Sequence, residues 1–494
     1  MRLDQVLSNA GVRGGLTPAL GATEVRGLAY DSRRVEAGYV FAAFPGARTD
    51  GRQYAGQALE RGAVAILSEQ QAPQGFAGAW LQVEQGRAAL AMACRNFYGP
   101  PETQLAFTGV TGTNGKTTFT YVMEGLLRAC GRRVGILGTI GNVLVGEFEP
   151  TANTTPESVD LYNLFERLKA RQGTDVVMEV SSHALALGRV HGLAFHTAVF
   201  TNLSQDHLDF HPDMEHYFGS KTKLFGPNGA AAPKFAITNF DDAYGRRIQP
   251  SAPTELITYG LQEGAAVRAT DISLGFDGVT YTLTWRGKSV RVHSPLVGEI
   301  NVYNTLAACA AGIAHGFSLD MIAAGIATCE AVPGRFERVD EGQPFLVVVD
   351  YAHTPDALRN AIGVARSLKP KRVITVFGCG GDRDRSKRPL MGSAAAELSD
   401  YVVLTSDNPR SEDPLHILTD AMVGLQRHDT PYAVEVDRTK AVLKAMRQAR
   451  TGDLVLIAGK GHETYQILKD ETIHFDDREV ARTVLREVGF GKGR

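Results

Sequence analysis

Cysteine is scarce in this chain of 494 residues, and its spacing argues against two kinds of site. The cysteines show no CxxC spacing, which speaks against both a disulfide framework and a zinc site. There are five of them: Cys94, Cys130, Cys309, Cys329 and Cys379. We expect all five to be small core residues, and only Cys379, in a glycine-rich loop, has surroundings that suggest a nearby ligand.

Long apolar runs and an excess of charge of one sign are also missing. No apolar run is long enough to cross a bilayer, and the start, MRLDQVLSNAGV, lacks the apolar core of a signal peptide. The formal net charge is -2, so nothing suggests a surface that binds polyanions. We therefore expect a cytoplasmic, monomeric protein whose partners are small molecules, with no nucleic acid and no membrane insertion.

Two stretches rich in glycine and proline divide the chain, Tyr98-Gly-Pro-Pro-Glu102 and Val332-Pro-Gly-Arg335. A chain of this length is too long for one core, and at about 150 residues per domain it should contain three domains. We predict domains at residues 1–99, 100–331 and 332–494.

Strand and helix patterns alternate in all three segments, which predicts an α/β protein with mostly parallel sheets. The apolar and polar residues of 267–292 alternate around two hairpin signals instead, which predicts a small antiparallel element there. The predicted strands lie at 40–44, 62–67, 134–137, 175–180, 198–201, 345–350, 372–378, 401–407 and 453–459, and the predicted helices include 86–98 and 158–171.

The stretch from 105 to 120, LAFTGVTGTNGKTTFT, predicts a buried strand that runs through a glycine-containing loop into a helix. The N–H groups at the start of that helix are unpaired and its dipole favours an anion, so a phosphate is expected there. Lys116 would reach the terminal phosphates, and the hydroxyl of Thr117 or Thr118 would bind Mg²⁺.

This phosphate-binding loop departs from the generic P-loop pattern at one position. The pattern needs a glycine five residues before Gly115, and the chain has Val110 there, with Gly112 inside the loop. A chance Gly-Lys-Thr in a surface turn is the alternative. The order of strand, loop and helix favours nucleotide binding.

Two further stretches in the central segment could bind a metal ion. Glu179 ends an apolar strand, where a carboxylate must be solvated, paired or bound to a metal; beside the P-loop strand it could hold Mg²⁺. A residue that caps a turn fits this stretch equally well. His207 could ligate a metal or donate to a phosphate, whereas Asp206, Asp209 and His211 fit loop hydrogen bonding equally well.

Polar loops directly follow the buried strands of the last segment, at 350–355, 378–385, 406–410 and 459–465. Ligands bind at the carboxyl ends of strands in open parallel sheets, glycines let a ligand approach the backbone, and arginines can bind a carboxylate or phosphate. Solvated arginines are the alternative for any single loop. Four such loops predict a second ligand-binding domain.

Seven motifs, in order along nearly the whole chain, resemble those of the Mur ligase family, in which the P-loop glycine is displaced in the same way. They are TGTNGKTT at 111–118, NTTP at 153–156, EVSSH at 179–183, NLSQDH at 202–207, GEINVYN at 298–304, PGRFE at 333–337 and DYAHTP at 350–355. The resemblance implies an N-terminal domain for the UDP end of a substrate, a central ATP-binding domain with a P-loop parallel sheet, and a C-terminal Rossmann-like domain that closes about a hinge near residues 331–334.

The reaction implied by the resemblance is the third-residue addition of peptidoglycan precursor synthesis. ATP phosphorylates the D-glutamate side-chain carboxylate of UDP-MurNAc-L-Ala-D-Glu, and an amine then attacks the acyl phosphate. The implied catalytic and metal-binding residues are Lys116, Thr117, Glu179, His207 and Lys221, with Mg²⁺ as cofactor. The resemblance also implies that CO₂ carbamylates Lys221, because a carbamate supplies a carboxylate where an ammonium would repel metal; Lys223 is expected to be a solvated charge.

The resemblance also implies the substrate contacts. ATP would bind Gly112, Thr113, Asn114, Gly115, Lys116, Thr117, Thr118, Asn301, Asn304, Arg335 and Asp350. The UDP-sugar dipeptide would bind Ser32, Ala47, Arg48, Thr49, Asn153, Thr154, Thr155, Ser181 and Arg189, although Leu187 replaces a glutamine found in some relatives. The incoming amino acid would bind Arg383, Asp407, Asn408, Pro409, Arg410, Gly459 and Glu463.

The motif Asp407-Asn-Pro-Arg410 resembles the signature of enzymes that add meso-diaminopimelate, whose second carboxylate needs an arginine. L-Lysine and L-ornithine carry the same distal ammonium, which Glu463 could also accept, so both stay alternatives. A folylpolyglutamate synthase-like ligase is a more remote alternative, disfavoured by the long N-terminal segment. A non-enzymatic nucleotide switch would need neither Glu179 nor Lys221.

Overall fold

The structure, a computed structural model, describes residues 1–46, 49–226 and 229–491. It divides into two compact units. The first comprises Met1–Arg268, Leu283–Val290 and Leu306–Gly325, and the second Ala269–Thr282, Arg291–Thr305 and Ile326–Arg494. Within the described ranges, no helix is both long enough and apolar enough to traverse a bilayer.

The N-terminal segment forms a five-stranded sheet in the order β1-β5-β4-β3-β2, in which only β1 is antiparallel to its neighbour. The predicted strand at 62–67 begins later, at Ala65; Gly62 has a left-handed φ of +96°, and a Cβ there would lie 2.8 Å from Ala37 Cα. The strands are β1 Val12–Gly14, β2 Gly27–Ala29, β3 Tyr39–Ala42, β4 Ala65–Ser68 and β5 Trp80–Val83, and the helices are α1 Leu3–Val6, α2 Pro18–Gly21, η1 Ser32–Arg34, η2 Gly51–Tyr54, α3 Ala55–Glu60 and α4 Gly86–Tyr98.

The central sheet has eleven strands in the order β16-β15-β14-β13-β12-β11-β6-β10-β7-β8-β9. All pairs from β7 to β14 in that order are parallel, in keeping with the predicted mostly parallel sheet, and β8 and β9 are antiparallel. β14 was predicted as part of an antiparallel element, but it pairs in parallel with β13. Its strands are β6 Ala106–Thr111, β7 Val134–Leu137, β8 Asn142–Leu144, β9 Glu147–Glu149, β10 Asp175–Glu179, β11 Thr197–Phe200, β12 Phe235–Asn239, β13 Glu255–Gly260, β14 Val267–Gly275, β15 Gly278–Trp285 and β16 Lys288–Ser294.

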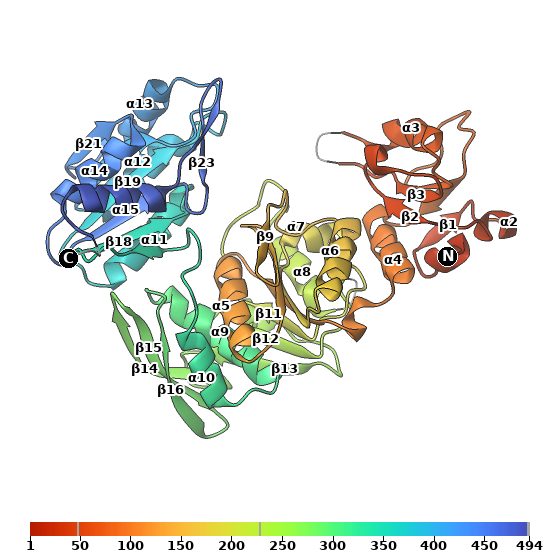
Figure 1. The fold of residues 1–494 in the computed structure, drawn as a ribbon, viewed down its shortest axis with the longest axis horizontal. Coiled ribbons are helices and arrows are strands. Elements are labelled where there is room, and N and C mark those ends of the chain that lie inside the picture. The colour runs from red at the N-terminus through yellow and green to blue at the C-terminus, as the bar shows by residue number, and fades with distance from the viewer. Residues whose placement is uncertain (47–48, 227–228, 492–494) are drawn as a thin grey trace. The chain divides into compact units, whose positions relative to one another are not determined.

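The helices that accompany this sheet include α5, which begins at Lys116 directly after the P-loop (Figure 1). The predicted antiparallel element is part of the same sheet, in which β14, β15 and β16 lie next to β13 in that order. A turn at 276–277 joins β14 to β15, and a turn at 286–287 joins β15 to β16. The helices are η3 Pro101–Thr103, α5 Lys116–Ala129, α6 Ser158–Ala170, α7 Ser182–Leu187, α8 Met214–Thr222, η4 Lys223–Phe225, η5 Gly245–Arg247, α9 Ile300–Ala314 and α10 Leu319–Ala327.

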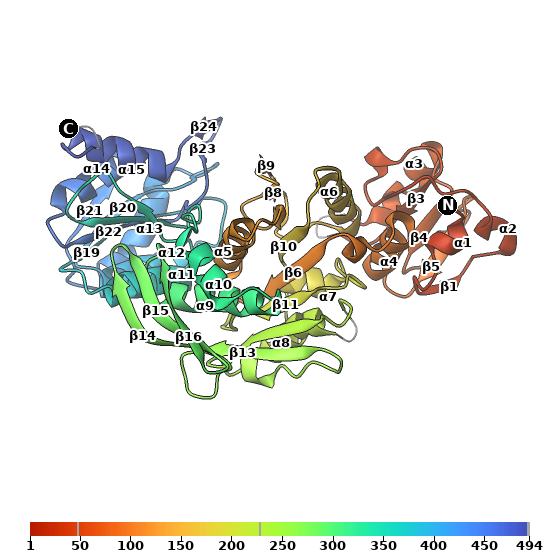
Figure 2. The ribbon, with the colours of Figure 1, turned by 60° about the horizontal axis from the view of Figure 1, so that its bottom comes forward.

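The C-terminal sheet has the order β17-β18-β22-β19-β20-β21, and only β17 is antiparallel. Leu346 and Val348 of β18 pack with α11, α12 and α13, while Val347 and Val349 pack with α14 and α15 on the other face (Figure 2). Side chains alternate across a strand, so a strand covered on both faces is apolar throughout, as in the predicted Rossmann-like domain.

The elements of this segment are β17 Glu337–Val339, β18 Leu346–Asp350, β19 Val373–Cys379, β20 Tyr401–Ser406, β21 Tyr432–Glu435, β22 Leu454–Ala458, the β23 Tyr465–Ile467 and β24 Thr472–His474 ribbon, and helices α11 Pro355–Ser367, α12 Lys387–Leu398, α13 Pro414–Leu425, α14 Arg438–Gln448 and α15 Asp477–Glu487.

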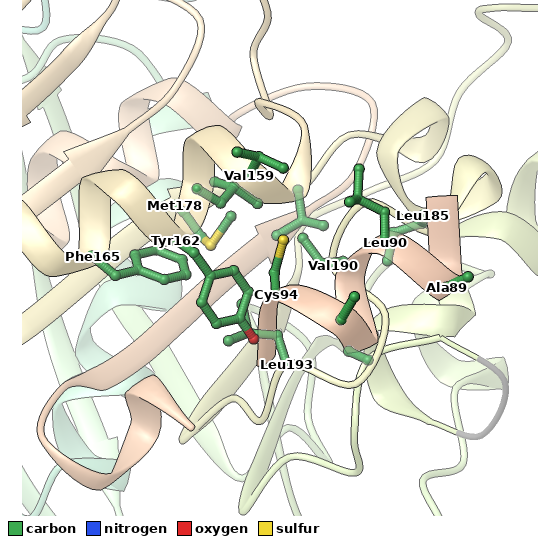
Figure 3. Packing of buried hydrophobic residues seen from close by; sticks show 14 of the residues in the cluster. Ala89, Leu90, Cys94, Val159, Tyr162, Phe165, Met178, Leu185, Val190 and Leu193 are labelled. Atoms are coloured by element: carbon green, nitrogen blue, oxygen red, sulfur yellow. The ribbon is translucent and has the colours of Figure 1, made fainter. Parts of the chain in front are cut away.

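The cysteines are core residues with one exception. Cys94 of α4 lies among Tyr162 of α6, Val190 and Leu193 in the core of the first unit (Figure 3). The thiol of Cys379 is 3.7 Å from the sulfur of Met391, and burial raises its pKa to about 12. Cys130 is only partly buried, so the prediction of a core position is wrong there.

Candidate active site

The P-loop joins β6 to α5, and two of its glycines are fixed by geometry. Gly112 has a φ of +149°, and a Cβ there would lie 1.9 Å from the Thr201 hydroxyl. Gly115 caps α5 in the left-handed region, at a φ of +87°. Val110, which replaces the generic P-loop glycine, is completely buried. The displaced glycine is therefore needed where the loop passes Thr201 at the end of β11.

The two lysines of the predicted site converge on one carbonyl oxygen. Lys116 Nζ donates to Gly112 O at 2.9 Å and to Thr113 O at 2.8 Å, and Lys221 Nζ donates to Gly112 O at 2.7 Å. Lys221 is 1% exposed, and its Nζ lies 4.4 Å from the centre of the Tyr217 ring. Burial and, less strongly, the charge of Lys116 hold the pKa of Lys221 well below its ordinary value.

Glu179 lies beside the P-loop, because β10 pairs with β6 in a register that sets Glu179 opposite Val110. Its carboxylate is 1% exposed. Oε1 accepts from the Thr117 hydroxyl and from Thr139 N, both at 2.9 Å, and Oε2 accepts from the Thr139 hydroxyl at 3.1 Å. Our sequence reasoning missed Thr139, although its position just after β7 is the kind of strand end where ligands bind.

The predicted dipeptide-binding residues of the central segment continue from this carboxylate. The hydroxyl of Thr154 lies 3.0 Å from that of Thr139, and Thr155 donates to the main-chain oxygen of Glu179 at 2.9 Å. Ser181 N donates to the Thr155 hydroxyl at 3.1 Å, and Arg189 donates to Thr155 O at 2.8 Å. The structure thus links four predicted residues to the P-loop side of the site.

Three other predicted residues of this group lie apart from that chain of contacts. Asn153 is exposed, and its main-chain oxygen accepts from Thr151. Ser32 is buried and donates to Gln57 at 2.7 Å, and the Thr49 hydroxyl lies 3.3 Å from that of Tyr54. Ala47 and Arg48 lie outside the described residues.

Glu157, another residue that the sequence did not single out, joins the N-terminal segment to the dipeptide-binding residues. Its Oε1 accepts from Arg87 of α4 at 3.0 Å and from Arg189 at 2.9 Å. The Arg87 guanidinium also lies 4.1 Å from the centre of the Phe44 ring. Two cations share one buried carboxylate, so the cluster keeps a net positive charge, and Arg87 also donates to Pro45 O at 3.3 Å.

His207 lies near the two lysines but is partly exposed, with 43% of its side chain accessible. It adopts a left-handed φ of +53°, and its ring centre is 4.9 Å from that of His183. The covered part of the ring lowers its pKa, which Asp206 opposes and Lys116 and Lys221 reinforce. A neutral imidazole can ligate a metal. Throughout the described ranges, no three His, Cys, Asp or Glu side chains gather as a metal site.

The predicted nucleotide residues of the second unit form two small groups. Asn304 donates to Asn301 at 2.9 Å, and Asn301 donates to Val297 O at 2.8 Å. Asp350 accepts from the main-chain N–H groups of Phe336 and Ala352, and its burial raises its pKa, opposed by Arg335.

Arg335 lies over an aromatic ring, with its guanidinium carbon 5.0 Å from the centre of the Tyr351 ring. Its Nε is buried and has no hydrogen-bond partner in the part of the chain that the structure describes. A buried donor without a partner is costly, so this atom is suited to a ligand.

The predicted amino-acid residues follow the adjacent strands β19, β20 and β22. Gly381 N donates to Asn408 O at 2.9 Å, and Arg410 donates to Gly381 O at 2.8 Å. A Cβ on Gly381 would lie 1.9 Å from Pro409 O, and one on Gly459 would lie 2.7 Å from Asp407 Oδ2. Asn408 Nδ2 donates to Glu463 at 2.9 Å.

Arg383 is exposed, and its Nη1 donates to the main-chain oxygen of its neighbour Asp382 at 3.3 Å. The sequence did not single out Arg388, Arg438 or Lys460, all of which are completely or almost completely buried around these loops. Nothing in a local pattern separates such residues from solvated charges.

Three protein-family models match most of the chain. Residues 24–98 match the Mur ligase family catalytic domain, 110–312 the Mur ligase middle domain, and 334–461 the Mur ligase glutamate ligase domain. A UDP-N-acetylmuramoyl-L-alanyl-D-glutamate--2,6-diaminopimelate ligase of Solibacter usitatus is 58% identical over 490 residues, covering 99% of each chain. One of the same name from Geobacillus thermodenitrificans is 46% identical, covering 94% of this chain and 96% of that protein.

Solved structures agree with these relatives. A structure named as the same diaminopimelate ligase has a TM-score of 0.73 and 34% identity, covering 99% of each chain. A folylpolyglutamate synthase of Mycobacterium tuberculosis shares the fold at a TM-score of 0.57 and 19% identity, covering 75% of this chain and 91% of that one. The coverage and identity of the curated relatives decide the classification: the chain belongs to the Mur ligase family.

Proposed function

We propose that this protein uses ATP to add meso-diaminopimelate to the D-glutamate side-chain carboxylate of UDP-MurNAc-L-Ala-D-Glu. The main support is the hydrogen-bonded chain from Thr117 of the P-loop helix through Glu179 and Thr139 to Thr154. It connects residues suited to phosphate and metal with residues suited to the dipeptide. The names and high coverage of the relatives support the choice of substrates.

The proposed reaction has two steps. A carboxylate oxygen of D-glutamate attacks the terminal phosphorus of ATP, the bond to ADP breaks, and an acyl phosphate forms. The amine of the incoming amino acid then attacks the acyl carbon, inorganic phosphate leaves, and the amine loses a proton as the amide forms. A carboxylate and a triphosphate repel each other, so positive charge at the P-loop is required.

Lys116 supplies part of that charge in this proposal. Its contacts to Gly112 O and Thr113 O hold the ammonium against the loop that would surround the phosphates, with Gly115, Thr118 and the N–H groups at the start of α5 beside it. Thr113 and Asn114 hold the loop itself, because Thr113 N donates to Asn202 O and Asn114 N to the Asn202 side chain.

The donor set fits Mg²⁺, a hard cation that prefers oxygen. Thr117 and Glu179 meet at 2.9 Å and are both buried, and His207 could add a neutral nitrogen. When bound, the ion would neutralise charge on the phosphates and the attacking carboxylate.

Lys221 is the residue best suited to carbamylation. Only a neutral amine adds to CO₂, and burial together with the neighbouring ammonium of Lys116 lowers the pKa of Lys221, which favours that neutral form. The added carboxylate would give the site an anion next to Lys116 instead of a second cation. We propose that Lys221 acts in this carbamylated form.

The remaining roles follow the groups described above. We propose that Asn301, Asn304, Arg335 and Asp350 contact the nucleoside of ATP, and that Ser32, Ala47, Arg48, Thr49, Asn153, Thr154, Thr155, Ser181 and Arg189 contact the UDP-sugar dipeptide. Arg383, Arg410, Asp407, Asn408, Pro409, Gly459 and Glu463 would bind the amino acid, with arginine for its distal carboxylate and Glu463 for its distal ammonium.

Phosphate release with different acceptors tests the proposal. With ATP, Mg²⁺ and diaminopimelate, the protein should release phosphate in the presence of UDP-MurNAc-L-Ala-D-Glu and not in the presence of a folate with glutamate. Mass spectrometry should show a product heavier by one diaminopimelate residue. Turnover on folate instead would support the folylpolyglutamate synthase-like alternative and contradict this proposal.

A further inference from the structure

Lys460 follows β22, and its side chain is 0% exposed. Its Nζ donates to Glu463 Oε2 at 3.0 Å and to Asn408 Oδ1 at 3.1 Å. Asn408 Nδ2 donates to the same Glu463 oxygen at 2.9 Å. Lys460 and Asn408 thus hold one edge of the carboxylate that is proposed to meet the incoming amino acid.

This arrangement is held by main-chain contacts of the two neighbouring loops. Ile467 N donates to Asn408 Oδ1 at 2.9 Å, and Gln466 donates to Asp407 O at 2.7 Å. Lys460 also lies 5.5 Å from the centre of the Tyr465 ring. A buried ammonium needs such partners, since an unpaired charge is costly to move out of water.

We infer that Lys460 is a positioning residue that sets the specificity of the amino-acid site, an inference that rests on the proposed function. Two donors occupy Oε2 of Glu463, so the carboxylate is held in one orientation with Oε1 turned away from them. Lys460 also compensates the charge of Glu463. A free carboxylate attracts any distal ammonium, whereas a compensated one attracts it weakly.

The consequence is discrimination between diamino acids. Lysine and ornithine offer only a distal ammonium, which the Lys460–Glu463 pair binds weakly. Diaminopimelate adds a carboxylate that Arg410 can bind, so its recognition depends less on Glu463 alone. Lys460 therefore disfavours the binding of lysine and ornithine as well as favouring that of diaminopimelate.

Steady-state kinetics with Lys460→Met and Lys460→Gln tests the inference, with thermal unfolding of each variant as a folding check. The ratio of kcat/KM for diaminopimelate to kcat/KM for lysine should fall about tenfold or more in both variants. KM for diaminopimelate should rise, while KM for ATP stays unchanged. Lys440→Met is the matched control, because Lys440 is exposed on α14 and pairs only loosely with Asp437 at 3.7 Å.

The outcomes separate this inference from the proposed function. If the wild-type protein uses diaminopimelate and either folded variant keeps the wild-type ratio, or loses both activities in proportion, Lys460 has no role in specificity. Should Lys460→Met fail to fold, Lys460→Gln decides, because its amide can still donate to Glu463 without the charge. A wild-type protein inactive with every diamino acid would contradict the proposed function itself.

Discussion

Lys116 and Lys221 donate to the same main-chain oxygen, that of Gly112, at 2.9 Å and 2.7 Å. Two full ammonium charges on one acceptor, one of them buried, would repel each other strongly. The repulsion between the two ammonium groups is relieved when Lys221 is neutral or carbamylated. This contact therefore underlies the first prediction.

Lys221→Ala should lower ATP-dependent ligation by about 10²-fold or more, because the site loses its proposed carbamate. Added bicarbonate should not restore activity, whereas a short carboxylate such as formate or acetate should restore part of it. Lys223→Ala, two residues along the chain and only partly buried, is the matched control and should keep near wild-type activity. Undiminished ligation by Lys221→Ala without added carboxylate would refute the carbamate proposal.

Gly112→Ala should abolish most ATP use, because alanine is strained at a φ of +149° and its Cβ would overlap the Thr201 hydroxyl. A loop displaced by about 1 Å costs about 10²-fold in rate. Isothermal titration with ADP should show weakened binding. Gly219→Ala is the control, since a Cβ at that helical position meets nothing within 4 Å, and it should bind ADP normally.

Arg410→Leu should raise KM for diaminopimelate by about 10- to 100-fold, as expected for loss of a charged hydrogen bond to the distal carboxylate. KM for lysine should change far less, because lysine lacks that group. Arg410 also donates to Gly381 O, so Arg410→Lys is needed to separate charge from loop geometry. Equal effects of Arg410→Leu on both amino acids would argue against the assignment.

Stability should fall with acid through His315. This residue lies next to Thr108 of β6, 3.0 Å from its hydroxyl, and burial lowers its pKa to about 3, helped by His196. The unfolded chain binds a proton near the ordinary histidine pKa of about 6.5 while the folded protein does not, so stability is lost as pH falls from about 6.5 towards 3.

The slope from this one group is at most about 1.4 kcal/mol per pH unit. In urea unfolding series between pH 4 and pH 7, His315→Gln should show a shallower dependence of the unfolding free energy on pH than the wild type. His416→Gln changes an exposed histidine of α13 and should keep the wild-type slope. Identical slopes for wild type and His315→Gln would show that His315 does not control acid stability.

Local patterns predicted much of the fold. β7 spans Val134–Leu137 as predicted. The parallel pairing of β10 with β6 places Glu179 beside the P-loop, a neighbourhood that local patterns left open. Apolar runs bounded by glycine identify strands, because a core strand is apolar along its own length and the chain turns where the strand ends. The glycine requirement at 112 comes instead from Thr201, a contact 89 positions away along the chain.

The supporting residues of the site could not be predicted in the same way. Thr139, Glu157 and Lys460 matter through partners that only the folded chain brings close, namely Glu179, Arg87 with Arg189, and Asn408 with Glu463. A threonine after a strand or a lysine in a loop has the same local signature when it is merely solvated. Burial, which distinguishes them, is a property of the tertiary structure.

A competition assay tests the central claim most directly. Purified protein is given ATP, Mg²⁺, UDP-MurNAc-L-Ala-D-Glu and equal concentrations of meso-diaminopimelate, L-lysine and L-ornithine, and the products are separated by mass. The account predicts that the diaminopimelate adduct dominates and forms together with one phosphate per amide. Dominance of the ornithine or lysine adduct, or phosphate release without any amide, would contradict it.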